Sequence, residues 1–179
     1  MPLIDSNGRN LTDPWILLAD GDAIPENGAV LVSLKRWQSD RQHLLTRSGP
    51  AGVLLESNED PLDIGPELRQ LALIALRLPK FTDGRPYSTA RLLRERHGYA
   101  GELRAVGAVL RDQLLFLKRC GFDSFEVASA SGTDLNRAFG ELSTAYQPAV
   151  DQTERIADLR VSDRTGYQSS KVCAAFWAY

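Results

Sequence analysis

The sequence has few of the residues that most often build redox or metal centres. Its 179 residues include two cysteines, two histidines and one methionine. Cys120 and Cys173 lie 53 positions apart and form no C-x-x-C pair, so we expect reduced thiols of a cytoplasmic protein. An iron–sulfur cluster normally takes four thiolates. His43 has no ligand-type partner at helical spacing, and His97 precedes Gly98 at an expected helix end, where a cation is favoured. We therefore expect no resident metal or cofactor.

Long apolar runs and an excess of positive charge are also absent. No apolar stretch approaches the roughly 20 residues that a membrane span needs. The first ten residues, MPLIDSNGRN, lack a secretory pattern, which again predicts a cytoplasmic location. A net charge of −2 argues against general nucleic-acid binding. No G-x-G-x-x-G, P-loop or G-x-S-x-G motif occurs, so the sequence displays no catalytic set.

Short apolar runs alternate with helical patterns along most of the chain. The expected strands cover residues 15–18, 29–32, 52–55, 73–76, 102–106 and 124–127. The expected helices cover residues 34–47, 63 or 66 through 71, 86–97, 110–120, and 133 or 134 through 142. This spacing favours parallel strands joined by right-handed crossovers. The units are too few for a closed eight-stranded barrel, so we predict an α/β fold, either a half TIM-like barrel or an open parallel sheet.

One domain accounts for most of this length. We assign residues 1–148 to a single α/β domain. Residues 149–179 form a C-terminal extension that ends in the aromatic side chains Phe176, Trp177 and Tyr179. Two alternatives stay open for the extension: it is poorly ordered, or it covers an apolar surface.

Positive charge is concentrated in residues 77–119, which carry ten Lys or Arg side chains against four acids. In α/β folds, ligands collect where strands end and helices begin, and helix N-termini attract anions. The loops at residues 79–85 and 106–108 are therefore candidates for an oxyanion site, in which guanidinium groups bind sulfate, phosphate or carboxylate. Its predicted members are Lys80, Asp83, Arg85, Tyr87, Ser88 and Arg104.

The other basic residues of this region are expected on the surface, where they would dock an acidic partner protein. This predicted docking face consists of Arg91, Arg94, Arg96, Lys118 and Arg119. For the arginines of the oxyanion site, the alternative is that they pair with nearby acids on solvated helix faces. Glu95, Glu102 and Asp112 are the acids available for such pairs.

The same region carries a family resemblance. The stretch FTDGRPYSTARLLRERHGYAGELRAVGAVLRDQLLFLKRCGF, with ALIALRLPKF before it and AYQP after it, resembles the bacterial DUF934 family. The resemblance covers roughly residues 50–148, and its most specific parts are D-G-R-x-Y-S-x-A-R-x-L-R and G-E-L-R-A-V-G. Members are usually encoded beside assimilatory sulfite (or nitrite) reductase and phosphoadenylylsulfate reductase. The resemblance implies a role in sulfur assimilation but supplies no activity, so whether the protein is an enzyme stays open.

Two functions follow as expectations. The first is an accessory protein of sulfite reduction that docks on sulfite reductase or its electron donor through the arginine-rich face. The second is a small enzyme or anion carrier with a sulfite- or sulfate-type site at the strand ends. Self-association is left open. Family members often have an acidic residue where this chain has Ala108. That replacement would impair a ligand or catalytic role, but would cost about 1 kcal/mol if the position only caps a helix.

Overall fold

The protein is built on one curled, seven-stranded sheet that forms half of a barrel. The computed structural model describes residues 1–127, 135–140, 146–147 and 149–150. The strands are β1 (Leu3–Asp5), β2 (Trp15–Leu17), β3 (Ala29–Ser33), β4 (Ala51–Leu55), β5 (Leu73–Leu78), β6 (Glu102–Val109) and β7 (Ser124–Val127). Their order across the sheet is β1-β7-β6-β5-β4-β3-β2. Strands β2 to β7 run parallel, and β1 pairs antiparallel with β7.

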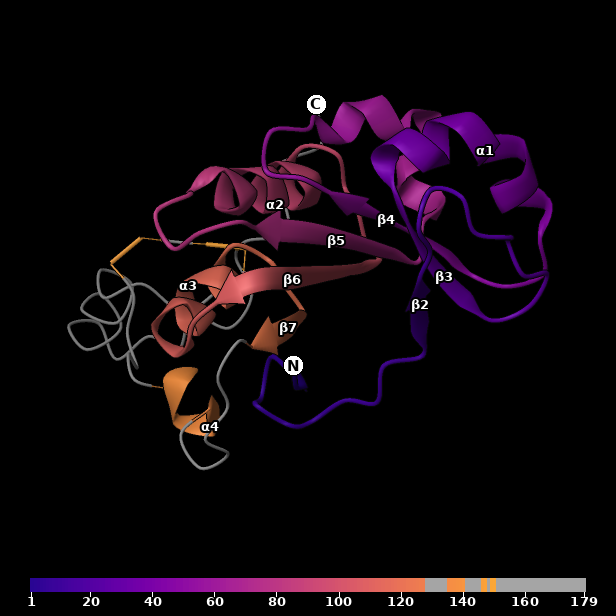
Figure 1. Ribbon diagram of the computed structural model, residues 1–179. Coiled ribbons are helices and arrows are strands. Elements are labelled where there is room, and N and C mark those ends of the chain that lie inside the picture. The colour runs from indigo at the N-terminus through magenta and orange to yellow at the C-terminus, as the bar shows by residue number, and fades with distance from the viewer. Residues whose placement is uncertain (128–134, 141–145, 148, 151–179) are drawn as a thin grey trace, which may run out of the picture.

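The helices cover one face of this sheet. They are α1 (Leu34–Thr46), α2 (Arg85–Glu95), α3 (Leu114–Arg119) and α4 (Leu135–Ala138), with 3₁₀ turns η1 (Pro61–Ile64), η2 (Pro66–Gln70) and η3 (Arg111–Gln113). In Figure 1, α1, α2 and α3 lie along one side of the curled sheet. The connection from β1 to β2 runs past the other side, because these two strands occupy opposite edges. Consecutive right-handed crossovers place successive helices on the same, convex face.

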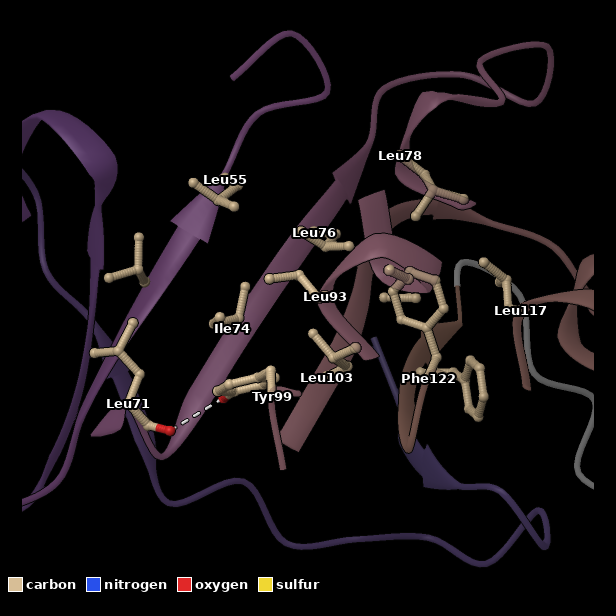
Figure 2. Packing of buried hydrophobic residues seen from close by; sticks show 14 of the residues in the cluster. Leu55, Leu71, Ile74, Leu76, Leu78, Leu93, Tyr99, Leu103, Leu117 and Phe122 are labelled. Atoms are coloured by element: carbon tan, nitrogen blue, oxygen red, sulfur yellow. Dashed lines mark hydrogen bonds between the residues drawn. The ribbon is translucent and has the colours of Figure 1, made fainter. Parts of the chain in front are cut away.

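The main core lies between the convex face and the helices. Side chains alternate along each strand, so Ile74, Leu76 and Leu78 of β5 point towards α2, where Leu93 meets them (Figure 2). Tyr99 closes this layer, and its hydroxyl donates a 3.2 Å hydrogen bond to the Leu71 carbonyl oxygen. Burial raises the pKa of Tyr99 well above its ordinary value, so the phenol stays protonated.

Most of the expected elements are present. The half-barrel alternative describes the sheet, and β2 through β7 occupy the predicted runs. The predicted helix before residue 71 is instead two 3₁₀ turns, because Pro61 and Pro66 each start a new turn. The predicted helix over 110–120 begins as a 3₁₀ turn and becomes α-helical only at Leu114. Strand β1 was not predicted. The predicted helix start at 133 or 134 and residues 151–179 lie outside the described residues.

Strand β6 is longer than predicted, and this changes the interpretation of Ala108. The strand continues to Val109, with an irregular register between Ala105 and Val109 and a φ of 97° at Gly107. Between these two paired positions β6 has two residues more than β7, and such a bulge bends the strand. Ala108 therefore lies inside a strand, so the interpretation of this position as a helix cap is wrong. Residues 106–108 do not form a loop that leads into a helix.

Candidate functional site

The loop after β5 holds an arginine in a fixed position at the start of α2. Pro86 occupies the first turn of the helix, where its missing N–H costs no hydrogen bond. The Asp83 carboxylate accepts hydrogen bonds from Arg85 Nε at 2.9 Å, Arg85 Nη2 at 2.6 Å and the Arg85 backbone N–H at 3.1 Å. Arg85 Nη2 also donates to Ser57 Oγ at 2.9 Å, which ties α2 to the loop after β4.

Asp83 stays ionised and holds the side chain of Arg85 in place. Its side chain is only 4% exposed, whereas that of Arg85 is 60% exposed. Hydrogen bonds from Arg85 and Ser57 lower the pKa of Asp83 far below its usual range, and the Asp83 carboxylate raises the pKa of Arg85. An acid that stays ionised in this way is unsuited to proton transfer near neutral pH. The pair therefore presents a fixed guanidinium, and Asp83 acts as its support.

Arg85 opens onto a cleft of about 600 Å³ between α2 and the loop after β4. The helix contributes Arg85, Ser88, Thr89 and Leu92 to its wall, and Arg96 and His97 line it just beyond the helix end. These positions recur at helical spacing, so one face of α2 lines the cleft. The loop contributes the side chains of Ser57, Asn58, Glu59, Asp60, Pro61 and Leu62.

Two acids of the loop are already partly engaged by backbone groups. Glu59 Oε2 accepts the Glu56 N–H at 2.7 Å, and Asp60 Oδ1 accepts the Leu62 N–H at 2.9 Å. They fix the shape of the loop. The cleft therefore combines two guanidinium groups and three hydroxyl groups with two carboxylates that hold the loop backbone. We call it the strand-end cleft.

The structure brings only part of the predicted oxyanion site together. Arg85 and Ser88 line the strand-end cleft, and Asp83 supports Arg85 from beneath. Lys80 is exposed and lies outside the cleft lining. Tyr87 packs against the main core, where burial raises its pKa.

Arg104 lies elsewhere. It is the third residue of β6, far from the carboxyl end of the strand, and its side chain is 5% exposed. Its Nε and Nη2 donate to Glu102 Oε1 at 3.1 and 2.9 Å, and its Nη1 donates to Asp13 Oδ1 at 2.9 Å. Alternation along the strand places it on the concave face, because Leu103 and Ala105 belong to the convex core.

Other residues of the cleft were missed or given another role. Ser57 and Thr89 were not singled out, Arg96 was placed in the docking face, and His97 was assigned to the helix end. The backbone of His97 does close the helix, through its N–H to the Leu92 carbonyl oxygen at 3.1 Å. The sequence does indicate Ser57 in one way: it follows a buried strand, and the carboxyl ends of neighbouring parallel strands lie close together in space.

Three of the five residues in the predicted docking face make internal contacts. Arg94 donates to the carbonyl oxygens of Tyr99, Gly101 and Gly121 at 2.7, 2.9 and 3.0 Å, and to Asp123 Oδ2 at 2.5 Å.

Lys118 Nζ donates to the Ser6 carbonyl oxygen, and Arg119 Nη2 donates to that of Gln147. Arg91 forms an exposed pair with Glu95 at 2.8 Å. Exposed pairs of this kind contribute little to stability. Arg91 and Arg96 are the members of the predicted face that remain exposed on α2.

The described residues suggest neither a metal centre nor a membrane span. Within the ranges given above, no group of three or more His, Cys, Asp or Glu residues is placed to hold a metal ion. No helix in those ranges is long and apolar enough to cross a membrane. Cys120 is half-buried and forms no disulfide among the described residues, and Cys173 lies outside them.

Comparison with known proteins gives one match. The profile of a family described as bacterial protein of unknown function (DUF934) matches residues 52–156. This span contains both walls of the strand-end cleft and covers more than half of the chain. No curated protein and no solved structure matches the chain. The chain therefore belongs to the DUF934 family.

Proposed function

We propose that the protein is a cytoplasmic accessory component of assimilatory sulfite reduction that binds a sulfur oxyanion in the strand-end cleft. The pathway is suggested by the gene neighbourhood that the family resemblance implies. The oxyanion is suggested by the chemistry of the cleft. The observation that carries the proposal is Arg85, which Asp83 and Ser57 hold in place on the cleft wall while 60% of its side chain stays exposed.

A fixed guanidinium is well suited to a tetrahedral or pyramidal oxyanion. Asp83 and Ser57 accept the hydrogen bonds of Nε and Nη2, which leaves the Nη1 group to donate to an oxyanion. Little side-chain entropy is lost on binding because Asp83 already holds Arg85 in place. The hydroxyl groups of Ser57 and Ser88 lie on the same cleft and supply further donors.

The distance between the two arginines of the cleft suggests that a ligand longer than sulfite or sulfate also fits. Arg85, at the start of α2, and Arg96, the residue that follows its end, lie eleven positions apart, which corresponds to about 16 Å along a helix axis. Sulfite or sulfate is too small to contact both. A sulfonucleotide such as adenylylsulfate is long enough to place its anionic group at Arg85 and its remaining groups towards Arg96.

Docking on sulfite reductase or its electron donor is a weaker second candidate. It is favoured by the exposure of Arg91 and Arg96 on α2. The internal contacts of Arg94, Lys118 and Arg119 leave a smaller basic surface than the sequence suggests.

Calorimetric titration tests the oxyanion proposal. We expect sulfite, sulfate or adenylylsulfate to bind with one site per chain, and Arg85→Met to weaken binding by more than about tenfold because a charge-assisted pair is lost. Arg85→Lys should restore only part of the affinity, since an ammonium group lacks the planar geometry that lets Arg85 contact Asp83, Ser57 and the anion together. Arg96→Met should weaken adenylylsulfate and leave the smaller anions unaffected.

Arg91→Met is the matched control, because it removes an exposed arginine of the same helix that lies outside the cleft lining. Circular dichroism confirms that each variant is folded. Absence of binding by the wild type to all three anions would reject the proposal, as would equal losses in Arg85→Met and Arg91→Met.

A further inference from the structure

The concave face of the half barrel contains a second cavity, which we call the concave trough. Alternate strand residues point to this face and form a separate apolar cluster of Leu31, Leu54, Leu73, Ala75 and Val106. The helices cover the opposite face (Figure 1). In a closed barrel the opposing strands fill this space with their side chains, and half a barrel lacks those strands. The cavity over the cluster measures about 620 Å³, a size typical of small-molecule sites.

The trough is closed at the amino ends of the strands. The segment leading into β2 crosses there, and Asp13 of that segment accepts the 2.9 Å hydrogen bond from Arg104. Trp15 follows and packs against the apolar cluster. Its ring lies over Gly52, where a Cβ atom would be only 3.1 Å from Trp15 Cζ3 and 2.9 Å from the Leu73 carbonyl oxygen. The glycine therefore leaves room for the indole ring, which forms part of the apolar wall.

The carboxyl ends of the strands carry the polar rim of the trough. Arg77, near the end of β5, lines the cavity beside Val106 and Gly107 of the β6 bulge. Arg77 Nε donates to Glu56 Oε1 at 2.8 Å, and the side chain is 38% exposed. That contact uses the Nε edge of the guanidinium, so the edge formed by its two terminal nitrogens has no partner among the described residues. This edge can bind an acidic group through two hydrogen bonds.

The charged side chains around the trough favour the rim as the position for the acidic group of a ligand. Deeper in the trough, Arg104 is already offset by Glu102 and Asp13. Glu126 lines the wall from β7, level with the β6 bulge and separated from Arg77 by the width of β6. At the rim, Glu56 binds the Nε edge of Arg77 and lies outside the cavity lining. Of the two arginines that line the trough, Arg77 is thus the one whose guanidinium is less engaged by acids and can bind an anion.

We propose that the concave trough binds a flat, largely apolar molecule that carries one acidic group. The acidic group pairs with Arg77, and the apolar body lies over Leu54 and Val106 against the ring of Trp15. This site is distinct from the strand-end cleft and independent of the oxyanion proposal. The two sites meet at one loop, where Glu56 holds Arg77 and its neighbour Ser57 holds Arg85.

Two fluorescent probes test the trough. 8-Anilinonaphthalene-1-sulfonate has a flat apolar body and one sulfonate, and N-phenyl-1-naphthylamine has the same body without the charge. We expect the sulfonate probe to bind the full-length protein at one site per chain. Arg77→Met should weaken the sulfonate probe by about tenfold, through loss of a charge-assisted pair, and leave the neutral probe unchanged.

Two further variants locate the binding. Leu17→Glu changes a trough residue that is 57% exposed, so the fold should survive, and it should weaken both probes. Arg91→Met is the control and should affect neither. The proposal is overturned if the sulfonate probe shows no one-to-one binding, if Arg77→Met leaves its affinity unchanged, or if Leu17→Glu affects neither probe.

Discussion

Replacing Arg94 by methionine should lower the free energy of unfolding by about 2 kcal/mol, the range expected when partly buried carbonyl oxygens lose their hydrogen-bond donor. Arg94 is 14% exposed, and its guanidinium joins α2 to the loops before β6 and β7. Methionine keeps much of the apolar stem but leaves three carbonyl oxygens without their donor. Urea denaturation followed by circular dichroism measures the loss.

Asp123 makes the loss at this position larger. Its Oδ2 atom accepts both Arg94 Nη2 and the Leu103 backbone N–H, so the carboxylate fixes the start of β6. Arg91→Met, three residues earlier on α2, removes only an exposed pair with Glu95 and should change stability by no more than about 0.5 kcal/mol. Equal stabilities of the two variants would contradict the structural role of Arg94 and would favour the sequence-based prediction that it belongs to the docking face.

Replacing Gly107 by alanine should cost roughly 2 kcal/mol, in the range of a strained backbone position. Its φ of 97° is one that residues with a Cβ atom rarely adopt. A Cβ atom here would also lie 2.6 Å from the Leu78 carbonyl oxygen on the neighbouring strand. The bulge would have to rearrange at the rim of the concave trough. Thermal and urea unfolding measure the cost.

Gly84 provides the matched control for this change. It precedes α2 with an ordinary φ of −87°, and a Cβ atom there would meet nothing within 4 Å. Gly84→Ala should be neutral or slightly stabilising, because alanine restricts the unfolded chain without strain in the folded one. If Gly107→Ala proved as stable as Gly84→Ala, the bulge would not depend on glycine.

The sequence was sufficient for the parallel part of the fold because each buried strand is a short apolar run between turn residues. The run at residues 73–76 is apolar on both faces of the sheet, as is typical of parallel strands. Strand β1 escaped prediction because three residues carry no periodicity, and its pairing with β7 joins segments about 120 positions apart. The extension of β6 through Gly107 was missed because glycine normally indicates the end of a strand.

The candidate site was predictable only where its residues are neighbours in the chain. Asp83 and Arg85 are two positions apart, and the turn before Pro86 brings them together. Arg104 was misplaced because the chemistry of a side chain does not reveal which end of a strand it occupies. Ser57 reaches Arg85 only through the sheet, from 28 positions away. Arg94 was assigned to a surface because most arginines are exposed, whereas here the carbonyl groups of two loops surround it.

Growth of a strain that lacks this gene is the most direct test of the proposed role. The proposal predicts normal growth on cysteine, a defect on sulfate and on sulfite as sole sulfur source, and rescue by the wild-type gene. The Arg91→Met gene should rescue, and the Arg85→Met gene should not, provided both proteins accumulate equally. Unimpaired growth of the deletion strain on sulfate and sulfite would contradict a role in sulfite reduction.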